Sequence, residues 1–282
     1  MKLGLCCMLH TTKMKKGFVG INAFNKSANP KEKLMEASLH NLAETKKCLE
    51  WVIENGTGMY RFSSDLIPFA ELWDWQSDPR ISLRLAELKK ICVENSIRTT
   101  IHPSQFCVIN SENLQVVQNS ISILNYHEVL CDRLGIDVII LHTGSSKGEY
   151  ARRFVEGYNC LSSRLKALIC LENCHKVDVN SVIEICEECN IRPILDLHHN
   201  RVCGNIDINS EVIKKVKTLW NGAKPIGHIS SGKSKSDDKA HADYISVEDI
   251  KKFRSFFDIF DLEVEAKKKD LAIAEILLDM KE

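Results

Sequence analysis

The stretch ILDLHHN (residues 194–200) combines an apolar run with a carboxylate and two imidazoles. Its apolar run follows the turn-like NIRP, which is typical of a strand buried on both faces in a parallel sheet. The same stretch carries Asp196, His198 and His199, and burying such groups is costly unless something compensates them. A divalent metal ion is the strongest candidate, and other strands that end in imidazoles or carboxylates would support it.

Similar short apolar runs recur along the chain, and longer amphipathic stretches separate them. The runs predict strands at residues 2–7, 58–62, 98–102, 137–142, 168–173, 193–198, 225–230 and 261–266. The stretches between them predict helices at 31–55, 81–96, 112–134, 149–166, 178–189, 209–219, 246–257 and 267–280, with capping signals such as Asp178 or Asn180 and Ser246. Eight alternations imply parallel strands joined by right-handed crossovers. We therefore predict an α/β protein folded as a (β/α)8 TIM barrel, with an open doubly wound sheet as the alternative.

The chain has 282 residues, which fits a single TIM-barrel domain over residues 1–282. Neither a convincing repeat nor a low-complexity linker divides it, and the most loop-like segments are 9–30 and 231–243. Lysine plus arginine equals aspartate plus glutamate, so the formal net charge is zero. Bulk charge therefore does not indicate a nucleic-acid binder, although a local basic patch is still compatible with one.

Twelve cysteines without the dense spacing of a small secreted scaffold indicate reduced thiols in an intracellular protein. Cys186 and Cys189 form a CxxC within a helical pattern and without a second CxxC, so ordinary thiols are favoured over a zinc site. The amino-terminal MKLGLCCML lacks a small-residue cleavage site, and we interpret it as a strand. No segment is long and apolar enough to cross a membrane. We expect an intracellular monomer without a protein partner.

Polar residues gather at the predicted carboxyl ends of the strands, where TIM barrels place their active sites. They are His102, His142, Glu172, Asp196, His198, His199, His228, His241 and Glu265. Each alone has a structural explanation, such as a hydrogen bond or an ion pair, but their convergence on one rim favours a shared ligand. Imidazoles mixed with carboxylates are typical of zinc, manganese or iron sites, whereas magnesium and calcium favour oxygen donors. So many donors exceed one tetrahedral ion and predict a cluster of two or three divalent ions.

The spacing leaves one pair of histidines open. His198 shares a face with Asp196 if the strand continues, whereas His199 takes that place if the chain has already turned. We interpret His175 as a loop residue, and the remaining histidines of the helical segments, His40 and His127, as structural.

Ordered motifs occur on every predicted strand. They are LGLCC at the amino terminus, YRFSSDLIPF (60–69), IHPSQF (101–106), LHTGS (141–145), LEN (171–173), LDLHH (195–199), GHIS (227–230), AHAD (240–243) and VEAKKK (264–269). Together they resemble the UV damage endonucleases, a family of the same broad barrel class as the apurinic endonucleases and sugar isomerases. The resemblance implies a metal-dependent repair enzyme that cuts damaged double-stranded DNA immediately 5′ to a lesion such as a pyrimidine dimer. It also implies a three-ion site in which manganese is favoured, with zinc as the alternative.

The resemblance further implies a role for each matching residue. The metal ligands would be His102, His142, Glu172, Asp196, His199, His228, His241 and Glu265, which selects His199 over His198. Gln105 and Phe106 match a pair that enters the duplex and replaces the displaced lesion, a task that suits an amide and an aromatic ring. A core position for Phe106 is the competing interpretation.

Three positions depart from the family pattern. Leu5 is a third predicted lesion-probing residue, at a position where the family commonly carries an aromatic side chain, and Phe106 lacks the hydroxyl group of the usual tyrosine. Ile226 stands where the family can carry a chemically modified lysine beside the metals, and Lys224 lies too deep to replace that lysine. These differences bear on lesion probing and on the number of metal ions.

The chemistry that we expect is in-line attack on a phosphodiester by a metal-activated water. It needs no separate side-chain nucleophile and leaves a 3′-hydroxyl and a 5′-phosphate. Lys233 and Lys235, in the loop 231–243, are candidates for phosphate contacts. Two alternatives are a metal-dependent sugar isomerase or epimerase of the same barrel class and a DNA-damage-binding protein that does not cleave.

Overall fold

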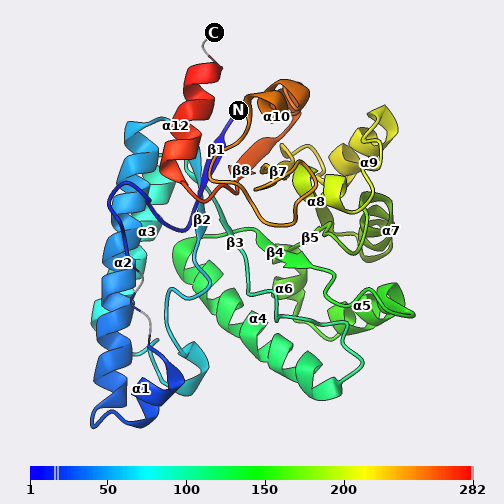
Figure 1. The fold of residues 1–282 in the computed structure, drawn as a ribbon. Helices are drawn as coiled ribbons and strands as arrows, with labels where there is room; N and C mark the ends of the chain where they lie inside the picture. The colour runs from blue at the N-terminus through cyan, green and yellow to red at the C-terminus, as the bar shows by residue number, and fades with distance from the viewer. Residues whose placement is uncertain (16, 18, 281–282) are drawn as a thin grey trace.

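The chain folds into a closed barrel of eight parallel strands, arranged in sequence order (Figure 1). The computed structural model describes residues 1–15, 17 and 19–280. The strands are β1 (Leu3–Cys6), β2 (Gly58–Phe62), β3 (Arg98–Ile101), β4 (Ile139–His142), β5 (Ile169–Glu172), β6 (Arg192–Asp196), β7 (Ile226–Ile229) and β8 (Asp261–Val264). β1 pairs with both β2 and β8, which closes the barrel. The predicted (β/α)8 barrel is confirmed, and the open sheet is excluded.

Helices surround the strands (Figure 1). They are α1 (Ile21–Asn25), α2 (Pro30–Glu54), the 3-10 turn η1 (Ala70–Leu72), α3 (Pro79–Glu94), α4 (Leu114–Leu134), α5 (Tyr150–Asn159), α6 (Ser163–Leu168), α7 (Val179–Cys189), α8 (Leu197–Val202), α9 (Ser210–Leu219), α10 (Val247–Lys252), α11 (Phe256–Ile259) and α12 (Asp270–Asp279). Within the described residues, no helix is both long and apolar enough to span a bilayer.

Several elements differ from the prediction, and a side chain caps the new helix in two of these places, α6 and α8. The predicted helix 149–166 is two helices, because the Ser162 hydroxyl accepts a hydrogen bond from the Leu165 N–H and starts α6. The predicted helix 246–257 is divided into α10 and α11, and no side chain among the described residues caps α11. The predicted strand 193–198 ends at Asp196, because its carboxylate accepts a hydrogen bond from the His199 N–H (2.5 Å) and caps α8. The helices α1 and η1 lie where no helix was predicted.

The barrel interior contains charged side chains as well as apolar ones. Asp261, Glu263 and Glu265 alternate along β8 and just past its end, and a period of two places them on one face. At the amino-terminal end of the barrel, Asp261 forms an ion pair with Arg98 (2.9 Å). One layer above, the buried Glu263 forms an ion pair with Arg61 of β2. Asp261, Glu263 and Glu265 therefore form a charged column that runs from the amino-terminal end of β8 to just past its carboxyl end.

Gly4 on β1 makes room for this column. A Cβ atom at position 4 would lie 2.8 Å from Cγ of Glu263, which is closer than such atoms approach in real structures. Glycine in a strand interior usually marks a close approach of this kind. The absence of a side chain at Gly4 therefore lets Glu263 point into the barrel.

Candidate metal centre

The Glu172 carboxylate is surrounded by imidazoles at the carboxyl end of the barrel. It is the last residue of β5 and is 1% exposed. Its Oε2 lies 3.0 Å from His102 Nε2 and 3.7 Å from His142 Nε2. Its Oε1 lies 2.9 Å from His228 Nδ1 and 3.4 Å from His199 Nδ1. One buried carboxylate thus meets histidines from four separate parts of the chain.

Asp196 belongs to a second group of candidate ligands. It is the last residue of β6, it is fully buried, and its Oδ2 has no hydrogen-bond partner among the described residues. The ligand atoms of Glu172, Asp196 and His228 lie within 4.8 Å of one another, and so do those of Glu172, His102 and His142. An unpartnered buried oxygen is costly without a donor or a cation. The donor set therefore fits divalent metal ions, with Glu172 shared between the two groups.

The other predicted ligands adjoin these groups. Because β6 ends at Asp196, His199 rather than His198 reaches Glu172, and His198 Nε2 instead lies 2.8 Å from the Asp238 carbonyl oxygen. The outer pair is Glu265, whose Oε1 is 3.6 Å from His228 Nδ1, and His241, whose Nδ1 is 3.7 Å from Glu265 Oε2. The structure thus brings all eight predicted side chains together. Their binding of metal stays a prediction.

Burial and charge act in opposite directions on these groups. Burial raises the pKa of Glu172, but His142 and His228 outweigh it and hold that pKa well below its usual value. Burial lowers the pKa of His142 to about 4. Burial also lowers the pKa of His199, but Asp196 and Glu172 outweigh it and raise that pKa to about 10. The ionised Glu172 and the neutral His142 are in the forms that bind a cation, whereas a cation must displace a proton from His199.

Two charged residues of this cluster, Arg61 and Glu263, were not predicted from the sequence. Arg61 Nη1 donates to Glu265 Oε1 (2.5 Å), and its Nη2 lies 2.9 Å from His228 Nε2. Glu263 Oε2 is 3.1 Å from the same His228 nitrogen. The signal for Glu263 was the alternation of acids from Asp261 to Glu265, which predicts one shared face.

The loop after β3 presents the two predicted lesion-probing residues to solvent. Gln105 is exposed and Phe106 is 76% exposed, so a core position for Phe106 is excluded. Leu5 is different, because it is fully buried in β1 and belongs to the hydrophobic core. A lesion-probing role for Leu5 is therefore wrong, since its side chain does not reach the surface. The roles of Gln105 and Phe106 stay predictions.

Neither residue near the modified-lysine position of the family offers a donor to the centre. Ile226 is fully buried and apolar. Lys224 Nζ lies 3.4 Å from Asp261 Oδ1, at the amino-terminal end of the barrel. Lys224 therefore lies at the opposite end of the barrel from the Glu172 cluster, as its position in the sequence predicted.

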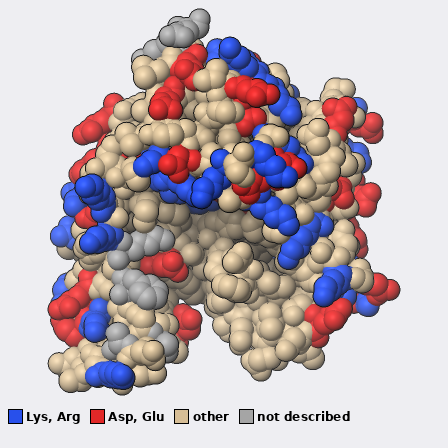
Figure 2. All heavy atoms as spheres, viewed as in Figure 1, with Lys and Arg blue, Asp and Glu red and all other residues tan. Residues whose placement is uncertain are grey.

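Basic side chains line a cavity next to Glu265 and His241. This cavity of about 350 Å³ is lined by Arg61, His241, Glu265, Lys267 and Lys269. The predicted pair Lys233 and Lys235 is exposed but lines a different cavity. Figure 2 shows lysine and arginine side chains, with acidic side chains among them, gathered above a hollow in this view of the molecule. Basic side chains are therefore available near the cluster, although the chain as a whole is neutral.

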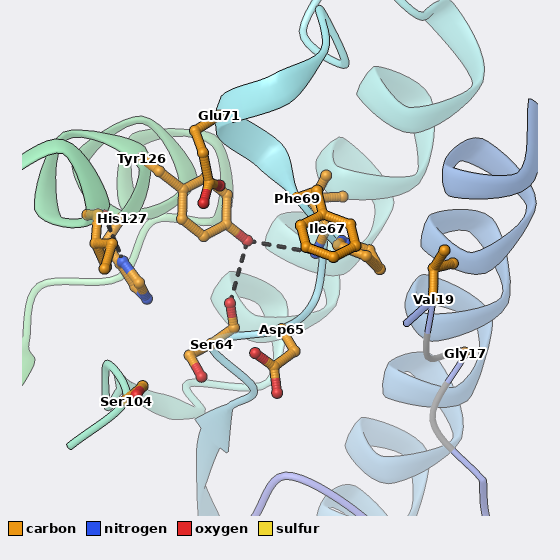
Figure 3. Close-up of a pocket in the computed structure, with 12 residues that line it drawn as sticks. Gly17, Val19, Ser64, Asp65, Ile67, Phe69, Glu71, Ser104, Tyr126 and His127 are labelled. Carbon is orange, nitrogen blue, oxygen red and sulfur yellow. Dashed lines mark hydrogen bonds between the residues drawn. The ribbon is translucent and has the colours of Figure 1, made fainter. Parts of the chain in front are cut away.

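A separate cavity of about 270 Å³ adjoins the loop after β3 (Figure 3). His127 of α4 turns its ring toward this cavity, and Ser104 lines it from the loop. His127 Nδ1 donates to the Ile123 carbonyl oxygen (2.7 Å), in keeping with a structural role, and burial lowers the pKa of His127 to about 4. None of the described residues that line this cavity is a predicted metal ligand.

A family model described as UV-endonuclease UvdE matches residues 1–282 of this chain. The chain belongs to the UV-endonuclease UvdE family. It is 29% identical over 269 residues to the UV DNA damage endonuclease of Bacillus velezensis, an alignment that covers 89% of this chain and 83% of that protein. The structure is also similar to the crystal structure of SacUVDE, with a TM-score of 0.90 and 27% sequence identity over 100% of this chain and 98% of that chain. Endonuclease IV from Thermus thermophilus matches over 100% and 99% with a TM-score of 0.65, and at 11% identity it shows the fold alone.

The buried, neutral His127 predicts a loss of stability in acid. Its pKa is about 4 in the folded protein and about 6.5 in an unfolded chain, so protons bind the unfolded state first as the pH falls. Stability is therefore lost between these two pKa values, by about 2 kcal/mol at pH 5. Urea unfolding at pH 7.5 and pH 5, with a chelator present, should show a loss that is about 2 kcal/mol smaller in His127→Gln than in the unsubstituted protein.

The matched control is His40→Gln, which removes an exposed histidine. It should leave the acid-induced loss unchanged. An equal loss in the His127→Gln variant and in the unsubstituted protein would contradict the assignment.

Proposed function

We propose that this protein is a DNA repair endonuclease that nicks damaged double-stranded DNA immediately 5′ to UV photolesions. The observation that carries the proposal is the Glu172 cluster at the mouth of the barrel, in a chain that the UV-endonuclease UvdE family model matches throughout. The Bacillus velezensis relative is a UV DNA damage endonuclease, which supports the same activity here.

Two or three divalent metal ions would complete the centre, with manganese favoured and zinc as the alternative. Glu172 would be shared, with His102 and His142 on one side and Asp196 and His228 on the other. A mixture of imidazole and carboxylate donors supports manganese or zinc over calcium. When bound, the ions supply the Lewis-acid activation that lets water hydrolyse a phosphodiester.

The exposed pair Gln105 and Phe106 supports the recognition of distorted DNA. A solvent-exposed ring next to an amide can enter a duplex where bases are already unstacked and can stack on their neighbours. Lys267 and Lys269 line the same cavity as Glu265, so they are better placed to meet a phosphate than Lys233 and Lys235.

A sugar isomerase or epimerase is the first alternative. Membership of the UV-endonuclease UvdE family and the exposed side chain of Phe106 argue against it. Such an enzyme encloses a small substrate, and it has no use for an aromatic side chain that is 76% exposed beside the site. A damage-binding protein that does not cleave is the second alternative. The intact set of eight candidate ligands favours catalysis over binding alone.

The proposed activity predicts nicking that depends on both damage and metal. With Mn²⁺, the protein should nick UV-irradiated plasmid and leave untreated plasmid intact, and a chelator should abolish nicking. Glu172→Gln should lower the rate by about 100-fold or more, because the amide removes the charge that both ligand groups share. Glu275→Gln, an exposed glutamate on α12, is the matched control and should keep full activity. Conversion of supercoiled to relaxed plasmid, followed on gels, measures the rate.

The outcomes separate the alternatives. A sugar enzyme would nick neither plasmid. A non-cleaving binder would retain irradiated DNA in a binding assay and nick it under no divalent metal. Either result would exclude the proposed activity.

The exposed ring predicts weaker recognition of damage when it is removed. Phe106→Ala should lower affinity for irradiated duplex about tenfold, because the stacking of one base on an aromatic ring contributes about 1–3 kcal/mol. Leu114→Ala is the matched control, since Leu114 is also 76% exposed and is the first residue of α4. Titration of a fluorescent irradiated duplex, with Ca²⁺ present to prevent cleavage, measures affinity. Equal losses in the two variants would contradict a specific role for Phe106.

A further inference from the structure

We propose that Glu263 is a positioning residue, which fixes the ring of His228 so that Nδ1 faces the metal centre. The inference rests on the metal site of the proposed function and on no step of DNA cleavage. It concerns a side chain from β8 that lies beneath the eight predicted ligands and is fully buried.

The two nitrogens of His228 face different surroundings. Nδ1 lies 2.9 Å from Glu172 Oε1 and 3.6 Å from Asp196 Oδ2, so it faces the candidate ligands. Nε2 faces into the barrel, where an unprotonated Nε2 accepts a hydrogen bond from Arg61 Nη2 (2.9 Å) and a protonated Nε2 has Glu263 Oε2 3.1 Å away as an acceptor. The ring is fully buried, so these barrel side chains determine what Nε2 can do.

A histidine that binds a cation through Nδ1 carries its remaining proton on Nε2. That proton needs an acceptor because the ring is buried. Arg61 cannot serve, since a guanidinium group has only donors. Glu263 Oε2 is an acceptor within hydrogen-bond distance, so it is the neighbour that matches the metal-binding form of His228.

Glu263 is itself held firmly in place. The Thr100 hydroxyl donates to its Oε1, and Arg61 forms an ion pair with its Oε2. Gly4 leaves the space that its side chain occupies. The carboxylate is therefore oriented before any cation binds, which is the condition for it to orient another group.

The negative charge of Glu263 has a second effect. It offsets the charge of Arg61, which would otherwise repel a cation across the His228 ring. A carboxylate behind a metal-binding histidine fixes the ring and increases its basicity, and loss of such a partner typically lowers metal affinity about 10- to 100-fold.

Glu263→Gln tests the proposal, because it keeps the shape of the side chain and removes its charge. Titration with Mn²⁺ against a competing chelator should give a dissociation constant about 10- to 100-fold higher than that of the unsubstituted protein. A second readout uses Zn²⁺ as a diamagnetic probe. Nitrogen-15 spectra of the zinc-loaded protein should show a His228 Nε2–H that exchanges slowly with water, and this exchange should become faster in the variant.

Asp261→Asn is the matched control. Like Glu263, Asp261 is a buried acid on β8 that forms an ion pair with an arginine, Arg98. It lies at the amino-terminal end of the strand, away from the predicted ligands. Its substitution should leave both the Mn²⁺ affinity and the His228 signal unchanged.

Thr100→Val provides a milder variant, because it removes the hydrogen bond that orients Glu263 and keeps every charge. It should shift both readouts in the same direction as Glu263→Gln. If Glu263→Gln does not fold, Thr100→Val replaces it as the test variant.

The outcomes distinguish this inference from the proposed function. An unsubstituted protein that takes up no Mn²⁺ would refute the metal centre itself. If that protein binds Mn²⁺ while Glu263→Gln keeps its affinity and its His228 signal, the positioning role is overturned. The role is also overturned if Asp261→Asn loses as much affinity as Glu263→Gln.

Discussion

A carboxylate that is buried and ionised must have positive charge or hydrogen-bond donors around it, and Glu172 imposes this constraint on the whole barrel mouth. Four histidines meet its two oxygens, and they come from the ends of different strands and from α8. Only the closure of the barrel brings these strand ends to one point. The Glu172 cluster is thus a product of topology, because no two of its four histidines are neighbours in the sequence.

The layer beneath the cluster is as highly charged as the cluster itself. Arg61 contacts Glu263, Glu265 and His228, and so links the barrel interior to its mouth. A well-packed apolar interior would serve stability at least as well as such buried pairs. The charged layer is better explained by the site, because it contacts His228 and Glu265, two of the side chains that would bind a cation.

The sequence was sufficient to predict the barrel and most of the site. Short apolar runs separated by amphipathic stretches, and polar residues at the ends of these runs, are local signals, and they located the eight strands and the histidines and acids at their ends. His199 required knowledge of where β6 ends, and that depends on the capping bond of Asp196. Leu5 was misassigned, because its direction depends on how β1 packs between β2 and β8. Arg61 was not predicted, because the role of a charged residue inside an apolar run depends on its contact partners. Those partners are distant in the sequence.

Anomalous diffraction from crystals soaked in Mn²⁺ would locate cations bound at the Glu172 cluster without reference to activity. We expect manganese peaks within bonding distance of Glu172, with Asp196 and His228 or His102 and His142 completing their coordination. A folded protein with no peak beside Glu172, and with these side chains turned away from one another, would contradict this expectation.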